Sequence, residues 1–290
     1  MKLKNLVIVL CFLFTQISFA NIAHVLDEET SLIGTYQDVM NTLLQVQTQY
    51  PENTEVFDLG VSNSGEMIKG IKIGHGPINN LIVATHHGNE FGSTEVAVAF
   101  AQATAKEPIQ GQTIYVIPVL NISGFNKRSR RETANNTTFD PNRDYPGPCG
   151  TEGPFNLKST YALSQFLAEK NIITSATMHT YWPAVVYPWG VSTHDTVTPY
   201  DDFFISLVKA ATVESHYTIG NSTEVIYPAD GTFEDYAFWK HGIWSLLFEI
   251  GNSHGPNQAD VKELIRVNVP GLRRMFIQSP TTQAEKHEFA

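Results

Sequence analysis

The chain has 290 residues, of which 42% are hydrophobic and 17% are charged, a composition typical of a globular protein. Its formal net charge of −10 argues against nucleic acid or an anionic membrane surface as a partner. A chain of this length can bury a sizeable core, so we expect a single domain.

The N-terminus has the pattern of a secretory signal peptide. Two lysines precede a short apolar run over residues 6–14, and the small residues Ser18 and Ala20 occupy the third and first positions before a cleavage site. The apolar run is too short to span a bilayer, and we expect no membrane span elsewhere. We therefore expect a signal peptide over residues 1–20, cleaved after Ala20, and a secreted mature chain over residues 21–290.

In the first half of the chain, the spacing of apolar residues predicts alternating strands and helices. Because strand, helix and strand follow one another, a parallel sheet with right-handed crossovers is favoured. Ser93 or Thr94 is the expected N-cap of the second helix. The predicted elements are a helix over 35–49, a hairpin of strands over 55–59 and 67–73, a strand over 81–85, a helix over 93–105 and a strand over 113–120.

The segment over residues 121–155 is polar and rich in Gly, Pro and Asn, and an irregular excursion of this length is usually functional. The remaining pattern completes a single α/β domain, with a mixed, mostly parallel sheet and helices on both faces. Its predicted elements are helices over 159–169, 200–214, 233–240 and 259–276 and strands over 174–178, 185–187 and 243–250, with a frayed tail after residue 278.

Three of these strands end in residues that can perform chemistry. His87 and Glu90 follow one strand, His179 ends another, and Glu249 lies near the end of a third. Two histidines and one glutamate, with the fourth position open to water, are the ligands of a catalytic zinc site, so one Zn²⁺ ion is expected. Zinc lowers the pKa of its water, and Glu249 is placed to take the proton as general base. The apolar strand around Glu249 should raise its pKa towards the working range.

The order of these and further motifs resembles the zinc carboxypeptidase family, which is built on the carboxypeptidase A fold, over about residues 36–276. The resemblance implies that fold and the hydrolysis of a C-terminal peptide bond. The motifs that carry it are Gly60-Val61-Ser62-Asn63-Ser64-Gly65, His87-Gly88-Asn89-Glu90, Asn121-Ile122-Ser123-Gly124-Phe125, Asp140-Pro141-Asn142-Arg143-Asp144-Tyr145-Pro146, His179-Thr180-Tyr181-Trp182, Ile226-Tyr227 and Phe248-Glu249.

The resemblance also implies how the substrate is held. Asn142 and Arg143 would grip its free terminal carboxylate, which suits the planar guanidinium fork, and Tyr227 would close over it. An arginine upstream would stabilise the oxyanion. We assign this role to Arg131, because Arg131-Glu132-Thr133-Ala134 resembles the Arg-x-Asn-Ala run of bacterial members. The alternatives are Arg128 and Arg130.

Substrate preference is expected to depend on Glu234, seven residues after Tyr227. In similar proteins this position reads the side chain of the released residue, so a carboxylate would favour lysine, arginine or the amine end of diaminopimelate. In the other interpretation, Glu234 lies in the first turn of the following helix and points outward. The motifs resemble those of bacterial members that act on cell-wall stem peptides, which makes the periplasm and murein peptides an expected setting.

Two other functions stay open. The sequence His-Gly-Asn-Glu also resembles the aspartoacylase and succinylglutamate desuccinylase branch, which shares the zinc site but cleaves N-acyl amino acids. A secreted binding protein of the same fold without activity is the second alternative. We expect a monomer, and stability from a core, since Cys149 is the one cysteine of the mature chain. Cys149 is expected to be an incidental thiol, while the roles of His86 and His254 are open.

Overall fold

The structure, a computed structural model, describes residues 33–149, 155–194, 197–285 and 289. The predicted signal peptide over residues 1–20 lies outside this part of the chain. No helix within the described residues is long and apolar enough to cross a membrane.

Eight strands form one mixed sheet in the order β1-β2-β4-β3-β7-β10-β8-β9. The neighbours β4, β3, β7 and β10 run parallel, whereas β1, β2 and β8 pair antiparallel with a neighbour. The predicted mixed, mostly parallel sheet is therefore confirmed. The strands are β1 (Thr54–Val61), β2 (Met67–Ile73), β3 (Ile78–Ala84), β4 (Gln112–Ile117), β7 (Ile172–His179), β8 (Ala184–Tyr187), β9 (Thr218–Asn221) and β10 (Trp244–Glu249).

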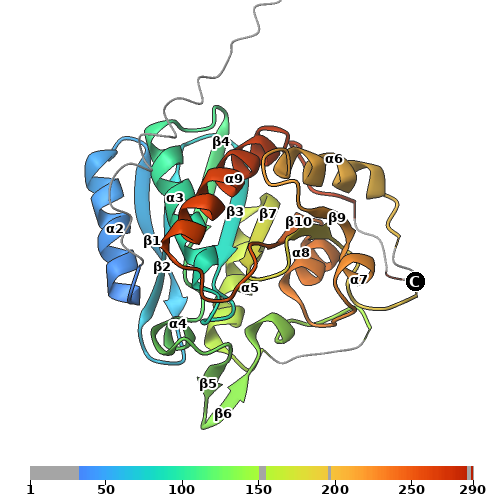
Figure 1. The fold of residues 1–290 in the computed structure, drawn as a ribbon, viewed down its shortest axis with the longest axis horizontal. Coiled ribbons are helices and arrows are strands. Elements are labelled where there is room, and N and C mark those ends of the chain that lie inside the picture. The colour runs from blue at the N-terminus through green and yellow to red at the C-terminus, as the bar shows by residue number, and fades with distance from the viewer. Residues whose placement is uncertain (1–32, 150–154, 195–196, 286–288, 290) are drawn as a thin grey trace, which may run out of the picture.

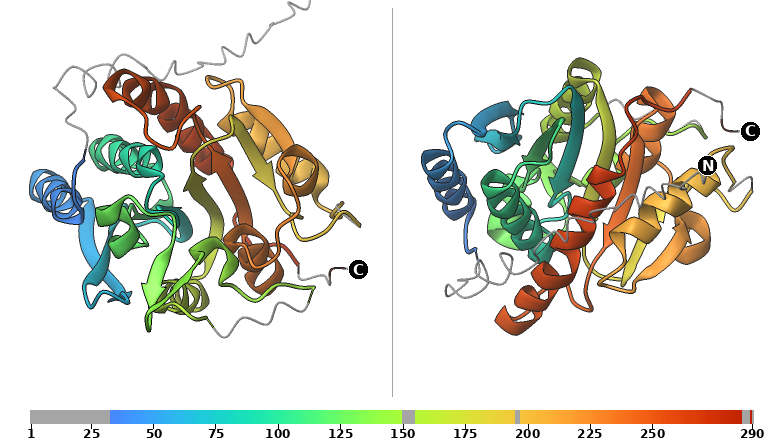
Figure 2. Two further views of the ribbon diagram at one scale, coloured as in Figure 1. Left: turned by 60° about the horizontal axis from the view of Figure 1, so that its bottom comes forward. Right: turned by 90° about the horizontal axis from the view of Figure 1, so that it is seen from above.

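Helices cover both faces of the sheet, as predicted (Figures 1 and 2). One layer contains α2 (Tyr36–Gln49), α3 (Phe91–Lys106), α6 (Asp201–Ala211) and α9 (Gln258–Ile277), and the opposite layer contains α5 (Lys158–Lys170) and α8 (Phe233–His241). A strand in a sheet covered on both faces is buried along its whole length, and every residue of β7 is buried, the polar ones included.

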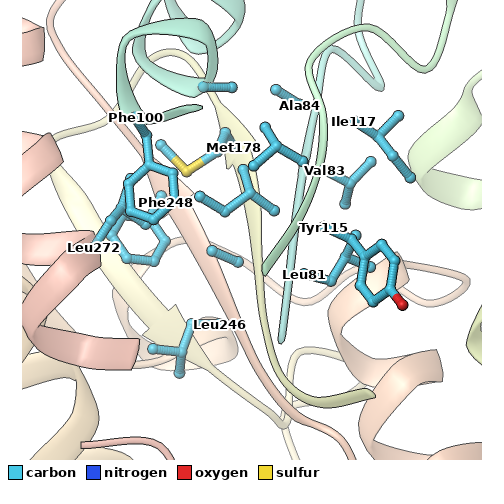
Figure 3. Close-up of a cluster of buried hydrophobic side chains, with 14 of the residues drawn as sticks. Leu81, Val83, Ala84, Phe100, Tyr115, Ile117, Met178, Leu246, Phe248 and Leu272 are labelled. Carbon is cyan, nitrogen blue, oxygen red and sulfur yellow. The ribbon is translucent and has the colours of Figure 1, made fainter. Parts of the chain in front are cut away.

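The core lies on both sides of the parallel strands (Figure 3). Met178 of β7 and Phe248 of β10 lie near Phe100 of α3 and Leu272 of α9, and all four are fully buried. Because side chains alternate along a strand, the neighbouring residues His179 and Glu249 point to the other face, towards α8. The same packing that buries the apolar residues therefore turns the polar strand ends towards one helix layer.

Helix α3 begins two residues before its predicted start, and neither predicted cap is used. Glu90 is the N-cap residue and makes no side-chain cap hydrogen bond. The hydroxyl of Ser93 donates to the carbonyl of Glu90 at 2.6 Å, and the hydroxyl of Thr94 lies 2.5 Å from that of Thr85. The helix start is buried beneath the strand ends, so these hydroxyls find partners inside the fold.

The segment over residues 121–155 was expected to be irregular but contains short elements. They depend on local polar contacts: the side chain of Asn121 accepts from the N–H of Gly124, and that of Asp140 accepts from the N–H of Asn142. The elements are α4 (Ile122–Lys127), the hairpin β5 (Glu132–Ala134) and β6 (Thr137–Phe139), which projects at the bottom of Figure 1, and the 3-10 helix η1 (Pro141–Arg143).

Two further short elements, β9 and α7 (Ser222–Val225), were also not predicted. The hairpin β5–β6 did carry a signal, because its turn residues Asn135 and Asn136 have φ of 50° and 61°, a conformation that asparagine tolerates better than most residues. Elements of three or four residues carry too little periodicity to be found from apolar spacing.

Candidate active site

The candidate site lies at the carboxyl edge of the parallel strands. Strands β3, β7 and β10 are neighbours that run in the same direction, so their carboxyl ends meet at one edge of the sheet. His179 is the last residue of β7, and Glu249 is the last residue of β10. His87 follows β3, and the chain then turns. The N–H of Glu90 donates to the carbonyl of His87 at 3.1 Å, and this turn places Glu90 at the same edge.

His87, Glu90 and His179 form a buried cluster. The two histidine Nδ1 atoms lie 3.1 Å apart, and they lie 2.8 Å and 2.9 Å from the two carboxylate oxygens of Glu90. At most 3% of each side chain is exposed. One ligand atom from each residue lies within 4.8 Å of the others. Two imidazole nitrogens and a carboxylate converging in a buried space are the donors that zinc requires, so the three predicted ligands fit this metal.

Charge in the cluster favours an ionised glutamate. Burial acts to raise the pKa of Glu90, but the adjacent His87 and His179 lower it below its usual range. The carboxylate also accepts a hydrogen bond from the backbone N–H of Thr180 at 3.2 Å. Glu90 is therefore held in the deprotonated form that a metal ligand needs.

Asp140 holds the outer side of His87. Its Oδ1 lies 2.8 Å from His87 Nε2, and its Oδ2 accepts from the Arg130 side chain at 2.9 Å and 3.0 Å. Burial acts to raise the pKa of Asp140, but the hydrogen bond with His87 and the charge of Arg130 lower it. A carboxylate on Nε2 leaves Nδ1 for a metal. Asp140 belongs to the motif over residues 140–146, and no role was predicted for it, although a carboxylate two residues before Asn142 indicated one.

The structure places Arg130, and not the expected Arg131, against the cluster. The Nη1 atom of Arg130 lies 3.3 Å from Glu90 Oε1 and 3.2 Å from His87 Nδ1, whereas Arg131 is exposed. Side chains alternate on the extended segment that enters β5, so Arg130 and the buried Glu132 point inward while Arg131 points to solvent.

Arg128, the remaining alternative, lies elsewhere. It donates to the carbonyls of Ile33 and Gly34 at 3.0 Å, and its guanidinium lies 4.4 Å and 4.5 Å from the ring centroids of Phe91 and Phe125. Its contacts anchor the start of the described chain rather than the cluster.

A cavity beside the cluster brings all four predicted substrate-binding residues together. It has two buried carboxylate oxygens in its wall, Oε2 of Glu234 and Oε2 of Glu249, that have no hydrogen-bond partner within the described residues. Burial and the negative charges of Glu90 and Glu234 raise the pKa of Glu249 well above its usual range, in the direction that its apolar strand predicted. The cavity is lined by His87, Arg130, Asn142, Arg143, Gly190, Ser222, Ile226, Tyr227, Ala229, Thr232, Glu234, Leu247 and Glu249.

Asn142 and Arg143 form one wall of this cavity. The side-chain oxygen of Asn142 accepts from the N–H of Phe233 at 2.8 Å, which joins η1 to the first turn of α8. Arg143 donates to the carbonyl of Asn142 at 2.5 Å and to the hydroxyl of Tyr227 at 3.4 Å. Tyr227 is 53% exposed, so its ring lies at the mouth of the cavity beside a cation.

Glu234 lies inside the fold, with 3% of its surface exposed. The alternative in which it points outward from the first turn of α8 is therefore wrong. Burial raises the pKa of Glu234, and the charge of Arg143 partly opposes this shift. The start of α8 orients the Glu234 side chain. Phe233, the first residue of this helix, donates its N–H to the side-chain oxygen of Asn142.

The residues whose roles were open lie at different depths. His254 lies on the solvent side of the cluster, and 46% of its side chain is exposed. Its Nδ1 lies 3.0 Å from the carbonyl of Thr180 and 3.9 Å from Glu90 Oε1. Its ring meets that of Tyr181 at 4.8 Å. Cys149 is exposed and does not line the cavity. His86 is fully buried behind the cluster.

Comparisons with known proteins agree with this geometry. A family model described as zinc carboxypeptidase matches residues 39–270. A carboxypeptidase B from Astacus astacus is 27% identical over 256 residues, which cover 72% of this chain and 82% of that protein. The chain spans 50% to 65% of the length of several other curated relatives.

Solved structures show the same fold. Bovine thrombin-activatable fibrinolysis inhibitor, in complex with tick carboxypeptidase inhibitor, matches with a TM-score of 0.75 at 17% identity over 83% of this chain and 95% of that chain. The murein-tripeptide amidase MpaA from Escherichia coli O157 matches with a TM-score of 0.54 at 16% identity over 80% of this chain and 94% of that chain. The family match, which extends over most of the chain and includes all three residues of the buried cluster, shows that the chain belongs to the zinc carboxypeptidase family.

Proposed function

We propose that this metallocarboxypeptidase removes a positively charged residue from the C-terminus of a peptide. The observation that carries the proposal is the buried carboxylate of Glu234, whose Oε2 lacks a hydrogen-bond partner within the described residues. A buried polar atom left unpaired costs about 1–3 kcal/mol, and more when it is charged. A lysine or arginine side chain, or the amine end of diaminopimelate, would supply the missing donor and balance the charge.

The free carboxylate of the substrate would bind at the wall that Asn142 and Arg143 form in the same cavity. Arg143 offers a planar guanidinium fork that matches a carboxylate. The oxygen of Asn142 is already engaged by Phe233, so only its amide N–H groups remain to donate. Tyr227, exposed at the mouth and next to Arg143, is placed to close over the bound end. A peptide with a free C-terminus, and not one with a blocked end, fits this wall.

The chemistry follows from the remaining residues. When bound by His87, Glu90 and His179, zinc supplies a Lewis acid that acidifies water and polarises a carbonyl. The free Oε2 of Glu249 takes a proton from the attacking water, whose oxygen forms a bond to the scissile carbonyl carbon. Glu249 then delivers this proton to the departing amine as the carbon–nitrogen bond breaks. In place of Arg131, we propose Arg130 as the cation that stabilises the negative oxygen, because its guanidinium lies beside His87 and Glu90.

The test is a set of peptides that differ only in the last residue: lysine, arginine, leucine or glutamate. A charge-assisted hydrogen bond contributes about 1.5–3 kcal/mol, so kcat/KM for lysine and arginine should exceed that for leucine by about 10- to 100-fold. Glu234→Gln should remove most of this preference while leaving cleavage of the leucine peptide within a few-fold. Glu263→Gln, at an exposed position on α9, is the matched control. A preference for leucine that Glu234→Gln does not alter would refute the assignment.

Additional substrates separate the alternatives. A murein tripeptide that ends in diaminopimelate tests the cell-wall setting, for which the pattern over residues 1–20 suggests export. Cleavage of an N-acyl amino acid but of no peptide would instead support the deacylase alternative. Zinc binding without turnover of any substrate would support a binding protein.

A further inference from the structure

His86 is a buried histidine beside the metal ligands that takes no part in the proposed hydrolysis. Its imidazole is fully buried and stacks on that of His179, with ring centroids 5.5 Å apart and an angle of 20° between the planes. On its other sides it meets Tyr145 and Phe233, at centroid distances of 5.9 Å and 5.5 Å. The ring is thus enclosed between His179 and two aromatic residues, Tyr145 after η1 and Phe233 at the start of α8.

Hydrogen bonds join His86 to the same ligand. His179 directs Nδ1 to the cluster, and with Nδ1 on a metal its Nε2 would carry the hydrogen and donate to the hydroxyl of Thr177, which lies 3.3 Å away. That hydroxyl also lies 3.3 Å from Nδ1 of His86. Nε2 of His86 in turn lies 2.9 Å from the hydroxyl of Tyr145. Both ring nitrogens of His86 are therefore engaged, and the ring cannot rotate without breaking a contact.

The far end of this arrangement is rigid. Tyr145 is fully buried, and its ring packs against Phe233 and Tyr236 at centroid distances of 5.6 Å and 5.4 Å. Its backbone N–H also donates to the carbonyl of Gly231 at 3.2 Å. A hydroxyl on such a fixed ring gives His86 a fixed partner.

We propose that His86 is a positioning residue that, with Thr177 and Tyr145, fixes the ring plane and the tautomer of the metal ligand His179. Asp140 performs the matching task for His87 through a carboxylate. At His179 the corresponding contacts come from uncharged groups in a chain: the hydroxyl of Thr177, the imidazole of His86 and the phenol of Tyr145. Partners of this kind affect metal affinity by about 10- to 100-fold when they are removed. The inference does not depend on the proposed substrate.

The test measures zinc affinity of the full chain by competition with a chromophoric chelator. Thr177→Val removes the hydroxyl that His179 donates to while keeping the shape, and His86→Phe keeps a stacked ring while removing both hydrogen bonds. Each should weaken zinc binding by about 10- to 100-fold. Because both variants interrupt one chain, the double variant should lose little more than the single variants. Thr177→Ser, which retains the hydroxyl, should restore affinity.

Two further measurements separate positioning from general destabilisation. The visible spectrum of the cobalt(II)-substituted protein reports ligand geometry and should change in Thr177→Val and His86→Phe. Tyr36→Phe is the control for the loss of a buried hydrogen bond, since Tyr36 is buried, its hydroxyl donates to the carbonyl of Met67, and it lies outside the site. It should lower the melting temperature without altering zinc affinity or the cobalt spectrum. Unchanged affinity and spectrum in Thr177→Val and His86→Phe, or an equal loss in Tyr36→Phe, would overturn the proposal.

Discussion

Glu249 and His179 are the last residues of adjacent parallel strands, and their Cα atoms are direct partners in the β10–β7 register. The pairing places the carboxylate of Glu249 beside a residue of the candidate metal cluster without any contribution from a loop. The backbone N–H of Ile250 donates to the carbonyl of His179 at 2.9 Å and extends the pairing past the strand end. A one-residue shift in register would turn Glu249 to the opposite face, so the apolar strand residues that fix the register also fix the site.

Glu249→Gln is expected to leave zinc bound and to lower kcat by about 10²- to 10⁴-fold, because the amide keeps the shape but cannot accept the proton. Mass spectrometry of the metal content checks that zinc stays bound, and turnover of a peptide with C-terminal lysine checks the loss in kcat. Near-normal turnover would remove Glu249 from the role of base.

Asp140→Asn is expected to weaken zinc binding by about 10- to 100-fold, because it removes the negative charge that faces His87 Nε2 and Arg130. Chelator competition provides the measurement. Asp58→Asn is the control, since Asp58 is half exposed and pairs with Lys69 on the hairpin β1–β2. Equal zinc affinity in both variants would show that the contact with Asp140 is dispensable.

Arg130→Ala and Arg131→Ala form a matched pair of neighbouring substitutions. Loss of a donor to the negative oxygen costs about 10²- to 10³-fold in kcat, so Arg130→Ala should show that loss and Arg131→Ala should stay within about twofold of the parent. Steady-state kinetics on one peptide decides between them. The reverse result would restore Arg131 to the role first expected for it.

The pH dependence of stability should include a contribution from Glu132. Burial raises its pKa from 4.5 to about 6, against the hydrogen bonds from Ser159 and Asn63. The folded chain therefore binds this proton more tightly, so the stabilisation is complete below pH 4.5 and is lost as the pH rises through about 6. The loss is about 2 kcal/mol, from 1.36 kcal/mol per unit. Urea unfolding at pH 4.5 and pH 7 should show a smaller decrease in Glu132→Gln than in the parent. An equal decrease would assign the effect to other groups.

Most of the fold could be predicted from apolar spacing, since long strands and helices repeat their pattern over several residues. The parallel centre of the sheet followed from the alternation of strands and helices. The short elements between residues 121 and 155 could not be found in this way, because single contacts such as that from Asn121 to Gly124 hold them. The start of α3 was misplaced because Ser93 and Thr94 satisfy their hydroxyls inside the fold rather than at a cap.

The sequence by itself identified the three residues of the candidate metal cluster and the neighbouring Glu249. His87 and Glu90 are close in the chain, and His179 and Glu249 end strands that the local pattern predicted, so local pattern was sufficient to bring them to one edge. Only the tertiary structure decided that Arg130 and not Arg131 faces this edge, that Glu234 points inward, and that Asp140 and His86 lie against the two histidines. These outcomes depend on the direction in which a side chain points from a short segment and on contacts with residues far away in the chain. The residue types alone specify neither the direction nor the contacts.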